Sequence, residues 1–128
     1  MNSEILLALE NIVGSSYIFI DDATRNTYGH DETEDLSFPP QVVVKPANTF
    51  EVSEILKISN RYKIPTVPIG ARTGLSGGAL AIYGGIGISM ERFNKILEID
   101  ERNLQITTEP GVITQVLREA AAEKGLLY

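Results

Sequence analysis

The sequence contains no cysteine and only one histidine, and it is short of positive charge. Without cysteine the chain forms no disulfide, offers no thiol nucleophile and builds no cysteine-based zinc or iron–sulfur site. Its 11 Lys and Arg residues stand against 17 Asp and Glu residues, which gives a net charge of −6. Nucleic acids and anionic membranes are bound by clustered positive charge. We therefore expect no nucleic-acid partner.

Long apolar runs are also missing. The longest candidate, residues 79–90, is about half of the length that a membrane span needs, and glycines interrupt it. The first 13 residues contain Glu4 and Glu10 without an early positive charge, unlike a secretory signal peptide. A hydrophobic content of 43% with 22% charged residues is typical of a globular domain.

The first part of the chain predicts one helix and a polar segment. Apolar residues at helical spacing predict a short amphipathic helix over 4–13, with Ser3 as its N-cap. The apolar run 17–20 predicts a strand or a packed turn. Residues 21–38 are polar and acidic, which favours a surface loop; the alternative is that Tyr28 and Asp31 anchor this segment near a functional site.

A βαβ unit follows. The β-branched run 42–44 predicts a buried strand, and residues 66–69 predict a second one. Between them, Asn48 and Glu51 resemble a capping box that begins a helix running to about Tyr62. The two strands of such a unit are expected to be parallel.

The last part of the chain predicts further strands and a helix. Residues 85–89 can form a strand whose glycines indicate a close backbone neighbour. Residues 96–99 and 104–108 predict an antiparallel hairpin, and the apolar spacing beyond it predicts a final helix capped at Gly125. The expected fold class is α+β: an α/β lobe with a βαβ unit, antiparallel strands and a C-terminal helix.

Glycine is concentrated in one stretch. Residues 64–90 hold seven of the eleven glycines and only one charged residue, Arg72. Glycine allows successive backbone N–H groups to face one point, which makes an anion site without lysine. Thr73 and Ser76 add hydroxyl donors, and Arg72 adds a permanent positive charge. The stretch follows a predicted strand, where ligands of open α/β sheets bind, so it predicts a site for a pyrophosphate or a similar oxyanion.

Two common nucleotide motifs do not fit this stretch. No Gly-Lys-Ser/Thr follows the glycines, which excludes a P-loop, and no G-x-G-x-x-G occurs, which excludes the Rossmann fingerprint. A glycine-rich turn region that binds nothing, and a non-enzymatic module that binds a phosphate ligand or a partner, remain as alternatives.

The surrounding sequence carries a family resemblance. The segment VPIGARTGLSGGA, its lead-in PPQVVVKPANTFEVSEILKISNRYKIP and the downstream EPGV occur in the order and spacing of one family. They resemble the FAD-linked oxidases of the vanillyl-alcohol-oxidase and p-cresol-methylhydroxylase (PCMH) type, within it the group of glycolate oxidase catalytic subunits and D-lactate dehydrogenases. The resemblance covers residues 28–128.

The resemblance implies FAD as the cofactor and assigns residues to it. Some relatives bond the flavin covalently through a histidine of this loop; that position is Thr73 here, which implies non-covalent FAD. Pro46 would belong to the cofactor wall, and Gly111 and Val112 would lie beside the flavin. The pyrophosphate loop would consist of Gly70, Ala71, Arg72, Thr73, Gly74, Leu75, Ser76, Gly77 and Gly78.

The resemblance also implies a larger protein. Family members are several times longer, so we expect residues 1–38 to form an N-terminal helix and polar loop segment. Residues 39–128 would form the first lobe of the FAD-binding domain, truncated before the second lobe and the cap domain. The complete enzyme would oxidise a small 2-hydroxy acid, glycolate or D-lactate, and a flavin reductase of cell-wall precursors is the alternative within the same fold.

For the 128-residue chain alone, the implied properties are narrower. We expect no catalytic residue and no metal site in it, no activity, and self-association through the face that would meet the missing lobe. The expected location is the cytoplasm, with peripheral attachment of the complete enzyme to the inner face of the membrane left open.

Overall fold

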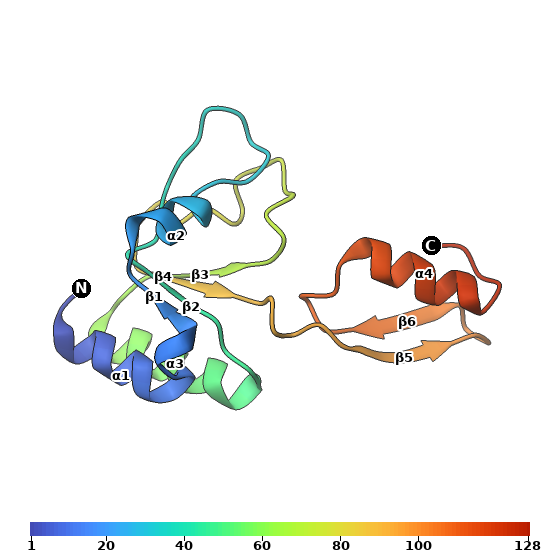
Figure 1. Ribbon diagram of the computed structural model, residues 1–128, viewed down its shortest axis with the longest axis horizontal. Helices are drawn as coiled ribbons and strands as arrows, with labels where there is room; N and C mark the ends of the chain where they lie inside the picture. Colours follow the sequence, from blue (N-terminus) through green and yellow to red (C-terminus); the bar gives the residue numbers. More distant parts are fainter.

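The computed structural model describes residues 1–128, and it places a four-stranded sheet beside a separate helix-covered hairpin (Figure 1). The strands of the sheet follow the order β1-β2-β4-β3. Strand β1 is antiparallel to β2, whereas β2, β4 and β3 are mutually parallel. The bounds are β1 (Ile18–Phe19), β2 (Val42–Val44), β3 (Thr66–Ile69) and β4 (Ile86–Ser89).

Helices cover both faces of this sheet. Helices α1 (Ser3–Val13) and α3 (Thr49–Tyr62) lie on one face and the short α2 (Asp22–Thr27) lies on the other (Figure 1). Val42 and Val44 pack with Ile5, Leu9, Val13 and Ile55 on the first side, whereas Val43 packs with Tyr28 and Ile69 on the second. A strand that is buried on both faces is apolar at every position, which explains the uninterrupted Val-Val-Val run.

The predicted βαβ unit is confirmed, and its two strands are parallel, but β4 lies between them. Residue types account for this order. Pro68 in β3 has no N–H to donate, so β3 is suited to the edge of the sheet. Strand β4 is fully buried, and Gly87 at its centre leaves room for the side chains of Pro40 and Ile69.

The N-terminal part differs from expectation at two points. The N-cap of α1 is Asn2, whose side chain accepts a 3.0 Å hydrogen bond from the Ile5 amide, and not Ser3. The polar segment 21–38 begins with α2, capped by Asp21 through a 2.8 Å bond from Thr24. A helix of six residues has too few positions to show an apolar period, so the sequence did not predict it.

The helix cap at Asn48 forms as predicted in one direction only. The Glu51 amide donates to the Asn48 side chain at 2.9 Å, but the Glu51 carboxylate accepts from the Ala47 amide, one residue before the cap.

The hairpin and the final helix form the second part of the molecule. Strands β5 (Ile96–Asp100) and β6 (Gln105–Thr108) are antiparallel, as predicted, and α4 (Thr114–Glu123) lies across them (Figure 1). The Asp100 side chain closes the turn by accepting from the amides of Arg102 and Asn103. None of the helices combines the length and apolar character that a membrane crossing requires.

Candidate functional site

The glycine-rich loop, residues 70–85, begins directly after β3 at the edge where the three parallel strands end. Carboxyl ends of parallel strands lie at the same edge, so the segments that follow β2, β3 and β4 come together there. The position predicted for the loop is therefore the position that it occupies.

The backbone of this loop offers many free donors. Nine of the ten amide N–H groups of residues 70–79 donate no hydrogen bond within the chain, whereas the Gly77 amide faces the Asp31 carboxylate and helps to lower the pKa of that group. The hydroxyl groups of Thr73 and Ser76 are also free, and both residues are exposed. Backbone N–H groups need a partner, which here is solvent or a ligand. An oxyanion is the ligand that consecutive N–H groups favour.

At three glycines of the loop, neither the backbone conformation nor the packing of the protein requires glycine. Five of the eleven glycines have a positive φ, and at three others a Cβ would come within 3.0 Å of a neighbouring atom. The remaining three are Gly70, Gly74 and Gly78, where the nearest atom to a Cβ is at least 3.8 Å away or none lies within 4 Å. A close-approaching ligand would explain all three, because a Cβ would occupy the space that it needs.

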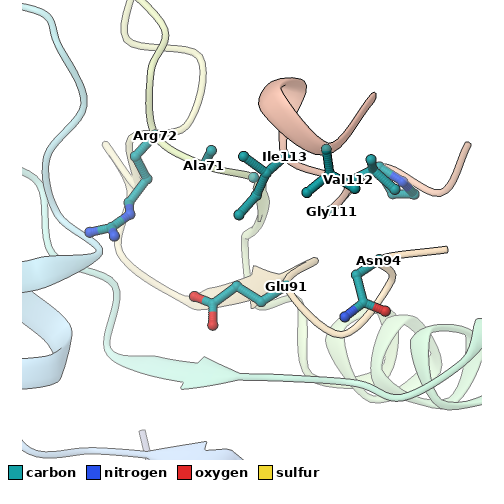
Figure 2. Close-up of a pocket in the computed structure, with 10 residues that line it drawn as sticks. Ala71, Arg72, Glu91, Asn94, Gly111, Val112 and Ile113 are labelled. Atoms are coloured by element: carbon teal, nitrogen blue, oxygen red, sulfur yellow. The ribbon is translucent and has the colours of Figure 1, made fainter. Parts of the chain in front are cut away.

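Arg72 is held by the protein. Its backbone has a left-handed φ of 60°, a conformation that costs a residue with a side chain about 1–3 kcal/mol. Its guanidinium donates to the Thr27 carbonyl and lies 4.8 Å from the centre of the Tyr28 ring. Figure 2 shows the side chain turned away from Gly111 and Val112. Arg72 is thus engaged with α2 and Tyr28 rather than directed into the space between the two parts.

A charged cluster at the same edge was not found by sequence analysis. Tyr28 is only 4% exposed and donates its hydroxyl to Glu91, whose other carboxylate oxygen lies 3.0 Å from the Lys45 ammonium. Lys45 directly follows β2, and Glu91 comes two residues after β4. The sequence did contain one signal for this cluster: Lys45, a charged residue immediately after the buried strand β2.

The cluster stabilises the charges of its members. Burial alone would raise the pKa of Glu91, but hydrogen bonds from Tyr28 and Lys45 outweigh it and leave that pKa lowered. Burial alone would lower the pKa of Lys45, yet its hydrogen bonds to Tyr28 and Glu91 leave that pKa raised. Both groups are therefore charged at neutral pH.

A cleft of about 500 Å³ separates the sheet from the hairpin and α4. It brings the start of the loop together with Gly111 and Val112, as Figure 2 shows. Residues 73–78 extend beyond this lining, and Pro46 is fully buried and contributes no surface to the cleft. The lining consists of Gly70, Ala71, Arg72, Glu91, Asn94, Pro110, Gly111, Val112, Ile113 and Val116.

These features define an α/β domain with room and free donors for an anionic ligand at its sheet edge. The chain belongs to the FAD binding domain family, which matches residues 40–128. The family assignment predicted from the glycine loop and its flanks is thereby confirmed, as is the mixed α/β fold.

Two curated relatives and one solved structure illustrate the family. The chain is 42% identical to the glycolate oxidase subunit GlcD of Bacillus subtilis over 106 residues, 83% of this chain and 23% of that protein. It is 39% identical to a D-lactate dehydrogenase of Anaerostipes hadrus, over 87% of this chain and 24% of that protein. The chain thus spans about a quarter of the length of these relatives. The structure of p-cresol methylhydroxylase with substrate bound superimposes with a TM-score of 0.82 over 96% of this chain and 25% of that one, at 22% identity, which shows a shared fold.

The loop suits the part of FAD that carries charge. FAD contains a pyrophosphate, and nine free amides, two free hydroxyls and three glycines without close packing neighbours meet the needs of such a group. The residues present therefore fit the cofactor that the family implies.

Proposed function

We propose that this chain holds the pyrophosphate of a non-covalently bound FAD within a larger flavin-dependent 2-hydroxy-acid oxidoreductase. The observation that carries the proposal is the set of nine amides without a partner among residues 70–79, at the carboxyl edge of the sheet. The loop glycines Gly70, Gly74 and Gly78 support it, because their missing side chains leave the backbone open to a ligand.

Each part of the loop has a role in this proposal. The backbone from Gly70 to Gly78, including Ala71, Leu75 and Gly77, donates to phosphate oxygens, and Thr73 and Ser76 add their hydroxyls. Thr73 cannot form the bond to the flavin that a histidine forms, so the cofactor is retained by contacts alone. Gly111 and Val112 face the loop across the cleft and border the cofactor there. Pro46 supports the wall from beneath, since it is fully buried.

The chemistry would come from the cofactor and from the rest of the enzyme. When bound, FAD would supply a hydride acceptor, so the complete enzyme could convert a 2-hydroxy acid into a 2-keto acid, with the hydroxyl proton taken up by a base outside this chain. We assign this substrate class because two relatives are named for glycolate and D-lactate. The chain itself binds and orients; it provides no acid or base for the reaction and is inactive alone.

The proposal is tested by titrating the isotopically labelled chain and following its amide signals by NMR. FAD is expected to shift the signals of residues 70–79, ADP to shift the same signals more weakly, and riboflavin, which lacks phosphate, to leave them unchanged. Weak binding is sufficient, because shifts report contact at millimolar ligand. Unshifted loop signals with both FAD and ADP would overturn the proposal.

A matched variant separates loop binding from general effects. Gly74→Ala combined with Gly78→Ala adds two methyl groups where the protein has no neighbour closer than 3.8 Å. The variant should fold as the wild type does and lose the FAD-dependent shifts. If ADP binds as tightly as FAD, without a preference for the flavin, a phosphate-binding module without enzymatic function becomes the better assignment.

A further inference from the structure

The polar segment before residue 40 lies outside the matched family region, yet it makes specific contacts with the glycine loop. The Glu32 amide donates a 3.0 Å hydrogen bond to the Gly74 carbonyl. Arg72 donates to the Thr27 carbonyl at the end of α2. Two points of the loop, Arg72 and Gly74, are therefore attached to residues 27–32.

Tyr28 is the residue on which these contacts converge. Its ring contacts two cations: the Arg72 guanidinium lies 4.8 Å and the Lys45 ammonium 5.4 Å from its centre. Its hydroxyl donates to Glu91, which also binds Lys45. Tyr28 thus connects the segments that follow β2, β3 and β4, although it belongs to none of them.

The backbone conformation of Arg72 shows why these contacts matter for the loop. A left-handed φ at a residue with a side chain persists only where the surroundings hold it. The contacts that hold Arg72 are the Thr27 carbonyl and the face of Tyr28, and its Nε is buried without a partner. Release of the guanidinium would let the backbone at Arg72 relax and change the direction of the neighbouring amides.

We infer that Tyr28 is a positioning residue that holds Arg72, and through it the donor loop of residues 70–79, in its binding conformation before any ligand arrives. Tyr28 does not line the cleft and acts on the ligand only through the loop. The anchoring of Arg72 stands on contacts within the chain; its consequence for cofactor affinity rests on the proposed function.

Trypsin provides a direct measurement of this anchoring. Cleavage after Arg72 requires its side chain to leave Tyr28 and Thr27, whereas Arg102 is exposed in the β5–β6 turn and serves as the internal reference. Proteolysis of a transiently opened site follows the population of the open form. Loss of a desolvated cation–π contact in Tyr28→Leu should raise the rate at Arg72 relative to Arg102 about tenfold.

Two further variants make the test specific. Tyr28→Phe keeps the ring and removes the hydroxyl bond to Glu91, so the relative rate should rise by less than in Tyr28→Leu. Tyr83→Leu is the matched control, because Tyr83 is 81% exposed and lies beyond the loop amides; its relative rate should equal that of the wild type. An unchanged rate at Arg72 in both Tyr28 variants overturns the inference, and if Tyr28→Leu does not fold, an unchanged rate in Tyr28→Phe does so alone.

Cofactor binding is the second readout. The FAD-dependent shifts of amides 70–79 should weaken in Tyr28→Leu, remain partly in Tyr28→Phe and remain fully in Tyr83→Leu. If the wild type shows no shifts while trypsin detects the release of Arg72, the proposed function fails and the anchoring stands. If the shifts are present and equal in all variants, the loop does not depend on Tyr28 and the inference fails.

Discussion

The amide of Gly111 donates a 2.7 Å hydrogen bond to the carbonyl oxygen of Phe93, and the missing side chain of Gly111 is what lets the two backbones meet. A Cβ at Gly111 would overlap the carbonyl groups of both Met90 and Phe93. Met90 and Phe93 follow β4, whereas Gly111 precedes α4. The contact therefore joins the two parts of the molecule and sets the width of the cleft between them.

Gly111→Ala should destabilise this joint. The added methyl group meets backbone atoms, which cannot rotate away as a side chain can, so the free energy of unfolding should fall by about 1–3 kcal/mol. Urea denaturation monitored by circular dichroism measures the change. An unfolding free energy equal to that of the wild type would show that the joint is looser than the structure indicates.

Alanine substitutions at three loop glycines should not destabilise the fold. At Gly70, Gly74 and Gly78 an alanine meets no close neighbour and no left-handed φ, so each substitution should leave stability unchanged or raise it by about 0.4–1 kcal/mol. Gly77→Ala is the matched control within the same loop. Its φ of 72° should make that variant less stable by roughly 1 kcal/mol. Thermal melts of the four variants check the contrast, and equal losses at all four positions would contradict it.

The ion pair between Lys45 and Glu91 should make stability depend on pH at both ends of the scale. Folding lowers the pKa of Glu91, so this group stabilises the fold at pH values above its pKa in the unfolded chain, and the stabilisation is lost as the pH falls. Folding raises the pKa of Lys45, so that group stabilises the fold at pH values below its pKa in the unfolded chain, and the stabilisation is lost as the pH rises. Glu91→Gln should therefore differ most from the wild type between roughly pH 5 and pH 10.

The size of this difference should be modest. The Glu91 side chain is 46% exposed, so solvent screening limits the effect to about 1 kcal/mol or less. Urea denaturation at a series of pH values measures it, with Lys57→Met, in the exposed pair with Glu54, as the control that changes little. A wild-type advantage that is constant from pH 3 to pH 11 would exclude the ion pair as its source.

Self-association should arise from the apolar surface of the hairpin and α4. Leu104, Leu127 and Tyr128 are 73%, 99% and 64% exposed and border a hollow lined by Ile106 and Leu117. Sedimentation velocity should show association that increases with concentration and decreases in Leu104→Ser combined with Leu127→Ser. Tyr83→Ser, which removes an exposed side chain from the other part, should not change it. A single monomeric species at all concentrations would contradict this prediction.

Much of the fold was predictable because local pattern and tertiary position agree. Val42 to Val44 form a fully buried strand, Asn48 begins a helix, and Asp100 to Asn103 turn a hairpin. Helix α2 was missed because it is too short to show a period, and the N-cap of α1 was placed one residue late because Ser3 and Asn2 are both good caps. The order of the strands was not predicted, since register and neighbours depend on contacts between distant segments.

The sequence by itself determined that a glycine-rich segment follows a strand, and it predicted that residues 70–78 serve as a donor loop, because glycine content and the absence of other motifs restrict what such a stretch can be. It also determined the family. Only the tertiary structure decided what surrounds that loop. Lys45, Arg72 and Glu91 meet at Tyr28 because three parallel strands end at one edge, and no spacing along the chain encodes that meeting. The charge of Arg72 was read from the sequence as a contact for the ligand; the folded chain uses it to hold the loop, since its guanidinium lies against Tyr28 and Thr27.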